Sequence, residues 1–199
     1  SYDNNLYAIN AADGKFQWKY PTGGGIVSRP GVYEGNVYFG SEDRSLHVVG
    51  ARSGKLVWNY NSDGAIRSSP RIAEGHVFFG SDDHYLHAVK LMTGRPAWKF
   101  ETTSPIRSTP FVTTELVYGG NESGDFYAVD FRGELKWRFQ AKRAITSSPI
   151  ATGPAVYFCS MDGTLYALDG RNGLIVWRYR LGKGSIVSPA VAENIVFTG

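Results

Sequence analysis

The sequence predicts an all-β propeller of five four-stranded blades, each about 40 residues long. Tryptophans stand at positions 18, 58, 98, 137 and 177, so successive ones are 40, 40, 39 and 40 residues apart. A turn ending in glycine precedes each tryptophan, and a proline follows twelve residues after it. No stretch between these markers has the length and period of an amphipathic helix. Sheets without covering helices can bury their faces only against one another, as the blades of a propeller do.

The first repeat shows the elements in order. Residues 5–10 alternate in polarity as a strand does, and residues 15–20 carry an aromatic side chain at every second position. Residues 26–33 form the next extended run, and Glu-Gly-Asn then gives a hairpin signal before residues 37–40. A further strand begins at residue 46. One period therefore contains four short antiparallel strands.

The later repeats keep this register position by position. The valine nineteen residues after each tryptophan recurs at 37, 77, 117, 156 and 196, and the proline recurs at 30, 70, 110, 149 and 189. Glycine ends the turn before each tryptophan, where a tight hairpin needs a positive φ. We expect the tryptophans to be framework residues packed between neighbouring blades: Trp18, Trp58, Trp98, Trp137 and Trp177.

Composition excludes several function classes. The net charge is +3 without any run of Lys or Arg, so neither nucleic acid nor an anionic membrane is an expected partner. No apolar stretch approaches the ~18 residues of a membrane span, so we expect no direct membrane insertion. Cys159 is the single cysteine and stands where the other repeats have Gly40, Gly80, Gly120 and Gly199, which predicts a buried small-residue role. We treat residues 1–199 as one domain.

The two ends of the chain match in phase. Residues 195–199 followed by residues 1–3 reproduce the pattern of residues 77–83. We therefore expect the terminal strands to pair within one blade and close the ring, because closure leaves no long sheet edge unpaired. The alternative, that the five repeats are part of a larger ring, remains open from the sequence.

The repeat also resembles a known family. Ala8-Ile9, Gly14-Lys15 and Trp18, with Val-Tyr-Phe-Gly-Ser at 37–41 and Ser-x-Pro between copies, resemble the pyrroloquinoline-quinone-like propeller repeat. The pattern is similar to that of BamB-type outer-membrane assembly lipoproteins and of propellers attached to bacterial serine/threonine kinases. The resemblance implies that the segment beginning at residue 26 is innermost in its blade, with the tryptophan strand outermost. It also implies a periplasmic or extracellular location.

Two features argue against enzymatic activity. The resemblance implies that enzymes of this family, the quinone-dependent dehydrogenases, are longer and eight-bladed, with a calcium site, a catalytic Asp and often an adjacent-cysteine disulfide. This chain has five repeats and one cysteine. The expected inner strands contain no Asp or Glu, which also argues against a glycosidase. We expect no cofactor, no catalytic residue and no activity.

Histidines and repeated aspartates have structural explanations. His47 and His87 occupy the slot that holds tyrosine in other repeats, and His84 with His87 lacks the further ligands of a metal site. Asp3, Asp43, Asp83 and Asp162 recur at one turn, where Asp commonly caps its own backbone. We expect no metal site.

The candidate ligand site is a group of cations near the starts of the inner strands: Arg29, Arg67, Arg107, Arg143 and Lys183. If they gather at one mouth of the channel, they could bind an anion or an acidic peptide. Alternatively they form a solvated rim whose counter-charges come from nearby acidic residues: Glu42, Asp82, Asp83 and Glu122. Both interpretations remain open from the sequence.

The function we expect is that of a binding or scaffolding module for protein or peptide partners within a larger bacterial protein. Two alternatives remain open: a ligand-sensing extracytoplasmic domain of a kinase-type receptor, and a BamB-like component of outer-membrane assembly.

Overall fold

A computed structural model describes all 199 residues, and every regular element in it is a strand. The first two strands pair only with each other: β1 (Asn5–Ile9) and β2 (Phe16–Pro21). Four complete antiparallel sheets follow. Their strands are β3 (Gly31–Tyr33), β4 (Asn36–Gly40), β5 (Ser45–Gly50) and β6 (Leu56–Asn61); β7 (Arg71–Ala73), β8 (His76–Gly80), β9 (Tyr85–Lys90) and β10 (Pro96–Glu101); β11 (Phe111–Val112), β12 (Leu116–Gly120), β13 (Asp125–Asp130) and β14 (Leu135–Gln140); and β15 (Ile150–Thr152), β16 (Ala155–Ser160), β17 (Thr164–Asp169) and β18 (Ile175–Arg180). The last pair is β19 (Ala190–Ala192) and β20 (Ile195–Phe197).

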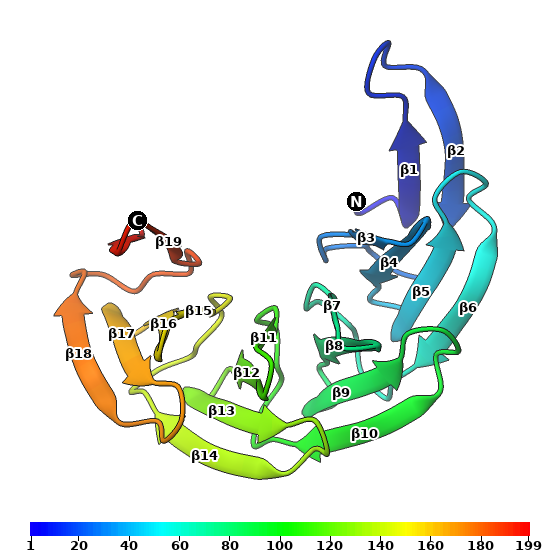
Figure 1. Ribbon diagram of the computed structural model, residues 1–199. Coiled ribbons are helices and arrows are strands. Elements are labelled where there is room, and N and C mark those ends of the chain that lie inside the picture. Colours follow the sequence, from blue (N-terminus) through cyan, green and yellow to red (C-terminus); the bar gives the residue numbers. More distant parts are fainter.

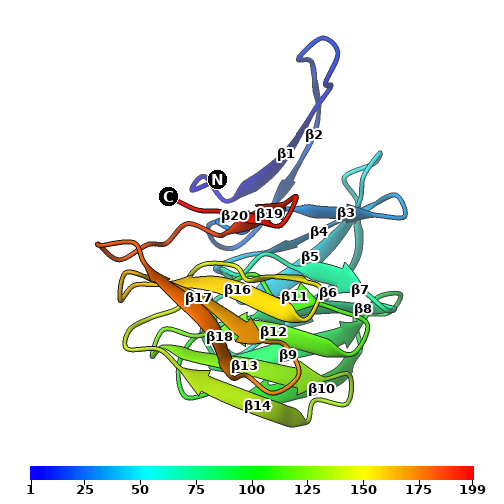
Figure 2. The ribbon, with the colours of Figure 1, turned by 60° about the vertical axis from the view of Figure 1, so that its left-hand side comes forward.

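The sheets are arranged around an axis as blades. The short strands β3, β7, β11 and β15 line the inside of the arc, and β6, β10, β14 and β18 lie on its outside (Figure 1). This is the strand order that the family resemblance implies. Figure 2 shows the complete sheets stacked against one another, with β1 and β2 projecting at one end of the stack. None of the elements is a helix with the length and apolarity of a transmembrane segment.

Ring closure is where the prediction was wrong. The chain forms an open arc, and β1–β2 and β19–β20 remain two separate two-stranded sheets (Figure 1). Matching phase shows that the two pairs are complementary parts of the same blade pattern. Whether they meet depends on the rotation from one blade to the next, which side-chain packing between sheets sets and the repeat period does not encode.

Packing between sheets produces the core. One buried cluster joins Tyr118 and Phe126 of one sheet to Phe158 and Leu168 of the next, and the other clusters likewise join neighbouring sheets. Trp137 lies against Gly173 of the next sheet, where an added Cβ would lie 2.5 Å from its Cε3 atom. The same contact joins Trp18 to Gly54, Trp58 to Gly94 and Trp98 to Gly133. Each of these glycines has a positive φ, as the hairpin pattern predicts.

The inner strands are shorter than the sequence suggests. The first of them begins at Gly31, directly after Pro30, and the other four also begin immediately after their proline. The residues before proline are outside the strands but are still held by hydrogen bonds. Ile66 N–H donates to the carbonyl of Ser41 in the preceding sheet, and within one blade Ser28 Oγ bridges the N–H and the carbonyl of Gly40. These segments therefore hold neighbouring sheets together as well as the strands within one blade.

Candidate functional site at the channel

A polar cavity of about 650 Å³ lies on the inner side of the arc. Its walls include one residue from the same position of each repeat, eleven after the tryptophan. These five residues, called the channel ring below, are Arg29, Ser69, Thr109, Ser148 and Ser188. Arg71 also lines the cavity, and no aspartate or glutamate does so.

Backbone hydrogen bonds hold neighbouring members of the channel ring together. The N–H of Arg29 donates to Ser69 Oγ at 2.8 Å, and the N–H of Ser148 donates to Ser188 Oγ at 2.8 Å. The N–H of Thr109 donates to Ser148 Oγ at 3.1 Å. Each of these bonds crosses from one repeat to the next, so the arrangement of the blades fixes where the hydroxyls stand.

Two of the predicted cations lie outside the lining of this cavity and are paired with acids. Arg67 Nε lies 2.9 Å from Glu42 Oε1, and the Arg67 guanidinium also contacts Asp82. Arg107 Nε lies 3.0 Å from Asp82 Oδ1, and its Nη1 lies 3.8 Å from Glu122 Oε1. We call this alternating row the mouth ribbon: Glu42, Arg67, Asp82, Arg107 and Glu122. Its positive charges have counter-ions in three of the four acids named for the solvated rim, whereas the fourth, Asp83, pairs with His87 instead.

The remaining predicted cations do not join the mouth ribbon. Arg29 stands eleven residues after its tryptophan, whereas Arg67 stands nine residues after its own. Arg29 therefore lies in the channel ring. Arg143 and Lys183 are exposed in the segments that lead to β15 and β19 and form no ion pair. The structure thus divides the five residues among the channel ring, the mouth ribbon and two linking segments.

Asp, His and Tyr side chains form buried ties between blades. His87 Nε2 lies 3.0 Å from Asp83 Oδ2, and its Nδ1 lies 3.2 Å from the Tyr60 hydroxyl oxygen. The imidazole stacks on Phe79, with ring centroids 4.9 Å apart. In another blade, Tyr166 fills the histidine slot and its hydroxyl donates to Asp162 at 2.8 Å. The shared slot therefore preserves one hydrogen bond with either side chain.

Electrostatics favour the charged form of these carboxyls. Burial raises the pKa of Asp83, but hydrogen bonding and charge from His87, with N–H donors from Tyr85 and Asp63, outweigh it. The pKa of Asp83 consequently lies below its ordinary value. The Asp63 N–H belongs to the segment that arrives from the preceding sheet, so this carboxylate also fastens the link between two sheets.

The blade of β11–β14 contains an ion pair between a buried aspartate and an exposed arginine that the sequence analysis missed. Ser123 takes the repeated aspartate position, and Asp125 two residues later supplies the carboxylate that accepts from the Tyr127 hydroxyl. Arg138 Nε donates to Asp125 Oδ1 at 2.7 Å. Burial raises the pKa of Asp125, but hydrogen bonds from Thr103, Arg138 and Tyr127 hold it below its ordinary value. The signal in the sequence was the two-residue displacement of the acid.

The cavity does not fit a metal-bound quinone. Calcium and similar hard cations require several carboxylate or carbonyl oxygen ligands, whereas the side chains lining the cavity are hydroxyls, prolines and arginines. No group of three or more His, Cys, Asp or Glu residues is placed to hold a metal ion. The side chains lining the cavity therefore do not provide the carboxylate ligands that a metal-bound quinone would need.

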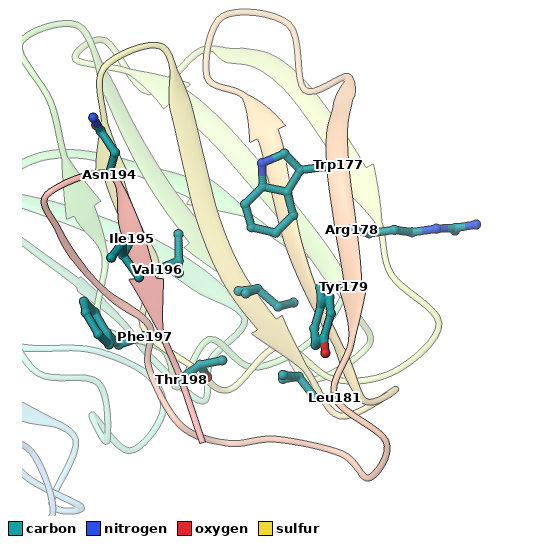
Figure 3. Close-up of a pocket in the computed structure, with 10 residues that line it drawn as sticks. Trp177, Arg178, Tyr179, Leu181, Asn194, Ile195, Val196, Phe197 and Thr198 are labelled. Atoms are coloured by element: carbon teal, nitrogen blue, oxygen red, sulfur yellow. The ribbon is translucent and has the colours of Figure 1, made fainter.

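A second cavity, of about 810 Å³, is mainly apolar and lies between β18 and β20. Figure 3 shows Trp177, Tyr179 and Leu181 on one side of it and Val196 on the other, while Arg178 points away. In the complete interfaces, the outer strands of the next sheet occupy the corresponding space. Because β19 and β20 form only a two-stranded sheet, the outer face of the β15–β18 blade is uncovered here.

Comparison with known proteins identifies the repeat. The family model described as outer membrane protein assembly factor BamB matches residues 2–138 and 122–199. The chain belongs to this family. No match was found among curated protein sequences.

Solved structures agree with the family assignment at the level of fold. BamB from Moraxella catarrhalis is 20% identical, with a TM-score of 0.81 over 92% of this chain and 60% of that one. The computationally designed Ika8 protein is 15% identical, with a TM-score of 0.88 over 98% of this chain and 62% of that one. A europium-containing methanol dehydrogenase is 13% identical, with a TM-score of 0.77 over 90% of this chain and 48% of that one. This member of the BamB family thus spans about three fifths of the BamB structure's length.

Proposed function

We propose that this chain is a non-enzymatic module that binds protein partners in outer-membrane protein assembly. The observation that carries the proposal is the family match over the whole chain, because the matching model describes an assembly factor. The structure adds support from the way it uses its reactive side chains. The set that most resembles a catalytic one, His87 with Asp83 and Tyr60, is a buried tie repeated in another blade by His47, Asp43 and Tyr20.

The polar surfaces available for recognition lie around the channel. The mouth ribbon alternates acidic and basic groups, and the channel ring presents hydroxyls and an arginine. Such groups suit a protein partner, because fixed charges and hydrogen-bond donors give an interface its specificity and its register. The outer strands, in contrast, present a sheet edge with scattered exposed apolar residues such as Leu56 and Val57.

Direct binding measurements test the proposal. The chain is immobilised on a biosensor surface and exposed to purified outer-membrane protein assembly components in detergent, with a cytoplasmic-membrane protein in the same detergent as the control analyte. We expect saturable binding, at about micromolar affinity as is common for exchangeable assembly contacts, only with the assembly components. The designed Ika8 protein provides a control surface of the same fold. Equal binding to Ika8, or none to the chain, would rule out the proposed role.

A further inference from the structure

The channel contains two arginines that lack the acidic partners found in the mouth ribbon. Arg29 uses its backbone N–H in the channel ring, and its side chain is exposed and forms no ion pair. Arg71 likewise forms no ion pair, and its guanidinium carbon lies 5.4 Å from the centre of the Phe111 ring. Both residues line the same cavity. Their charges are therefore uncompensated by the protein, unlike those of Arg67 and Arg107.

The hydroxyls of the channel ring add further hydrogen-bond donors. Ser69, Ser148 and Ser188 each accept a backbone N–H from the preceding repeat. A hydroxyl has one proton to donate and can accept through its lone pairs, so accepting the N–H leaves the O–H available. No hydrogen bond within the protein takes the O–H of these three serines. The cavity wall is thus supplied with guanidinium and hydroxyl donors.

A cavity of this composition attracts negative charge. No carboxylate lines it, and a partly enclosed space with walls of one sign concentrates the electrostatic potential. Arginine presents a planar fork of donors that matches the two oxygens of a carboxylate. The volume of about 650 Å³ falls within the range of ordinary ligand sites, which is about 300–1,000 Å³.

We infer that the channel cavity binds a carboxylate group carried by a peptide segment of the partner, through Arg29 and Arg71 and the hydroxyls of the channel ring. Phe111 restrains the Arg71 guanidinium, which reduces the entropy lost when the arginine engages an anion. The inference rests on the proposed function in one respect, namely that the partner is a protein. The anion site is thus assigned to Arg29 and Arg71, and not to Arg67 and Arg107, whose charges are neutralised by acids.

Fluorescence anisotropy with a labelled hexaglutamate peptide tests the site, and hexaglutamine of the same length is the uncharged control. We expect the chain to bind hexaglutamate and not hexaglutamine, with affinity falling as salt concentration rises. The double variant Arg29→Gln plus Arg71→Gln should lose about tenfold or more in affinity, equivalent to about 1.4 kcal/mol. Arg29→Lys should lose less, because it keeps the charge but not the planar fork.

The matched control removes two cations elsewhere. Arg52 and Lys55 are exposed in the turn before β6 and form no ion pair, so Arg52→Gln plus Lys55→Gln changes the net charge by the same amount. Hexaglutamate affinity should stay within about twofold in this variant. Equal losses in the two double variants would show a diffuse charge effect and overturn the site. Loss only in Arg67→Gln plus Arg107→Gln would also overturn it and would assign the anion to the mouth ribbon.

Two further outcomes separate this site from the proposed function. Inorganic phosphate at fixed ionic strength should compete with hexaglutamate only weakly, and phosphate binding without any hexaglutamate binding would overturn the peptide assignment. If the chain binds the outer-membrane assembly components but not hexaglutamate, the site is wrong and the protein-binding role stands. If it binds hexaglutamate through Arg29 and Arg71 but none of those components, the site stands and the role is wrong.

Discussion

The two faces of the β15–β18 blade are built differently. On the face toward β11–β14, Gly120 meets Ile145, and Trp137 is only 7% exposed with its Nε1 donating to the Gly170 carbonyl at 2.9 Å. On the face toward β19–β20, Cys159 occupies the glycine position and Ser185 the isoleucine position. Trp177 is 38% exposed there and borders the apolar cavity. The same repeat positions thus support two different interfaces.

The facing pair is glycine and isoleucine in three interfaces, and cysteine and serine in this one. A Cβ on Gly120 would lie 2.3 Å from Cγ2 of Ile145, and the corresponding distances at Gly40 and Gly80 are 2.3 and 2.2 Å. Cys159 fits because serine has replaced the facing isoleucine. The Cys159 sulfur then lies 3.2 Å from Thr198 Oγ1 and is fully buried. Compared with the glycine–isoleucine pairs, the first residue of this pair is larger and the second is smaller.

Replacing the two tryptophans should produce the largest contrast. Trp137→Ala removes a buried ring together with its hydrogen bond, and we expect it to lower the free energy of unfolding by about 3–5 kcal/mol. Trp177→Ala should cost about 1–2 kcal/mol, because much of that ring is already in contact with water. Urea unfolding followed by circular dichroism measures both. Equal losses would mean that the covering blade contributes little to the tryptophan's stabilising effect.

Adding a methyl group at the tight contact should have the next largest effect. Gly120→Ala would overlap Ile145 and should cost about 1–3 kcal/mol. The double variant Gly120→Ala plus Ile145→Ser has a serine opposite position 120, as Cys159 has opposite it. Adding the methyl group should therefore lower the free energy of unfolding less in this variant than it does when Ile145 is present. A double-mutant cycle from urea unfolding isolates the coupling. Additive effects would contradict the pairing of these positions.

Sequence reasoning predicted the blade pattern well because each marker residue has a local physical role. The tryptophan spacing predicted the outer strands, and the hairpin glycines had the positive φ expected of them. Closure was not predictable in this way. The angle between blades depends on the detailed packing of contacts such as Ile145 on Gly120, and the spacing of the tryptophans does not give that angle.

The candidate site shows the same limit at the level of single residues. Arg29 and Arg67 both lie near the start of an inner strand, but a difference of two positions puts one in the channel ring and the other in the mouth ribbon. Arg71 was missed because it stands at the first residue of β7, where the other repeats have no cation. An arginine is neutralised where an acidic side chain from a neighbouring loop lies close to it. The distances between these acids and the arginines depend on the fold.

Acid should weaken the complete interfaces more than the last one. Asp43, Asp83 and Asp162 accept backbone N–H groups from the linking segments before β3, β7 and β15. Because the folded pKa of Asp83 is lowered, its stabilisation is fully present above the unfolded value of about 4 and is lost as the pH falls through the folded pKa.

Hydrogen exchange at pH 6 and pH 3, corrected for intrinsic rates, measures this difference. Protection of residues 62–66 should decrease more than that of residues 182–186, whose hydrogen bonds involve no Asp or Glu side chain. Asp83→Asn should cost about 1–2 kcal/mol at neutral pH and flatten the dependence on pH. An unchanged pH dependence in Asp83→Asn would show that other groups govern acid sensitivity.

Removing the sulfur at Cys159 should have the smallest effect. The site faces Ser185 and already accommodates a small residue, so Cys159→Ala should lower the free energy of unfolding by about 1 kcal/mol or less. Burial raises the pKa of the Cys159 thiol, which keeps it protonated and unreactive at neutral pH. Iodoacetamide should therefore label the native chain far more slowly than the urea-unfolded chain.

The variant Ser185→Ile places isoleucine against the cysteine and should lower the free energy of unfolding more than Cys159→Ala does. Adding Cys159→Gly to Ser185→Ile should recover the loss, because it restores the pair found in the other interfaces. Rapid native labelling, or a Ser185→Ile variant as stable as the parent chain, would show that the two residues do not pack against each other.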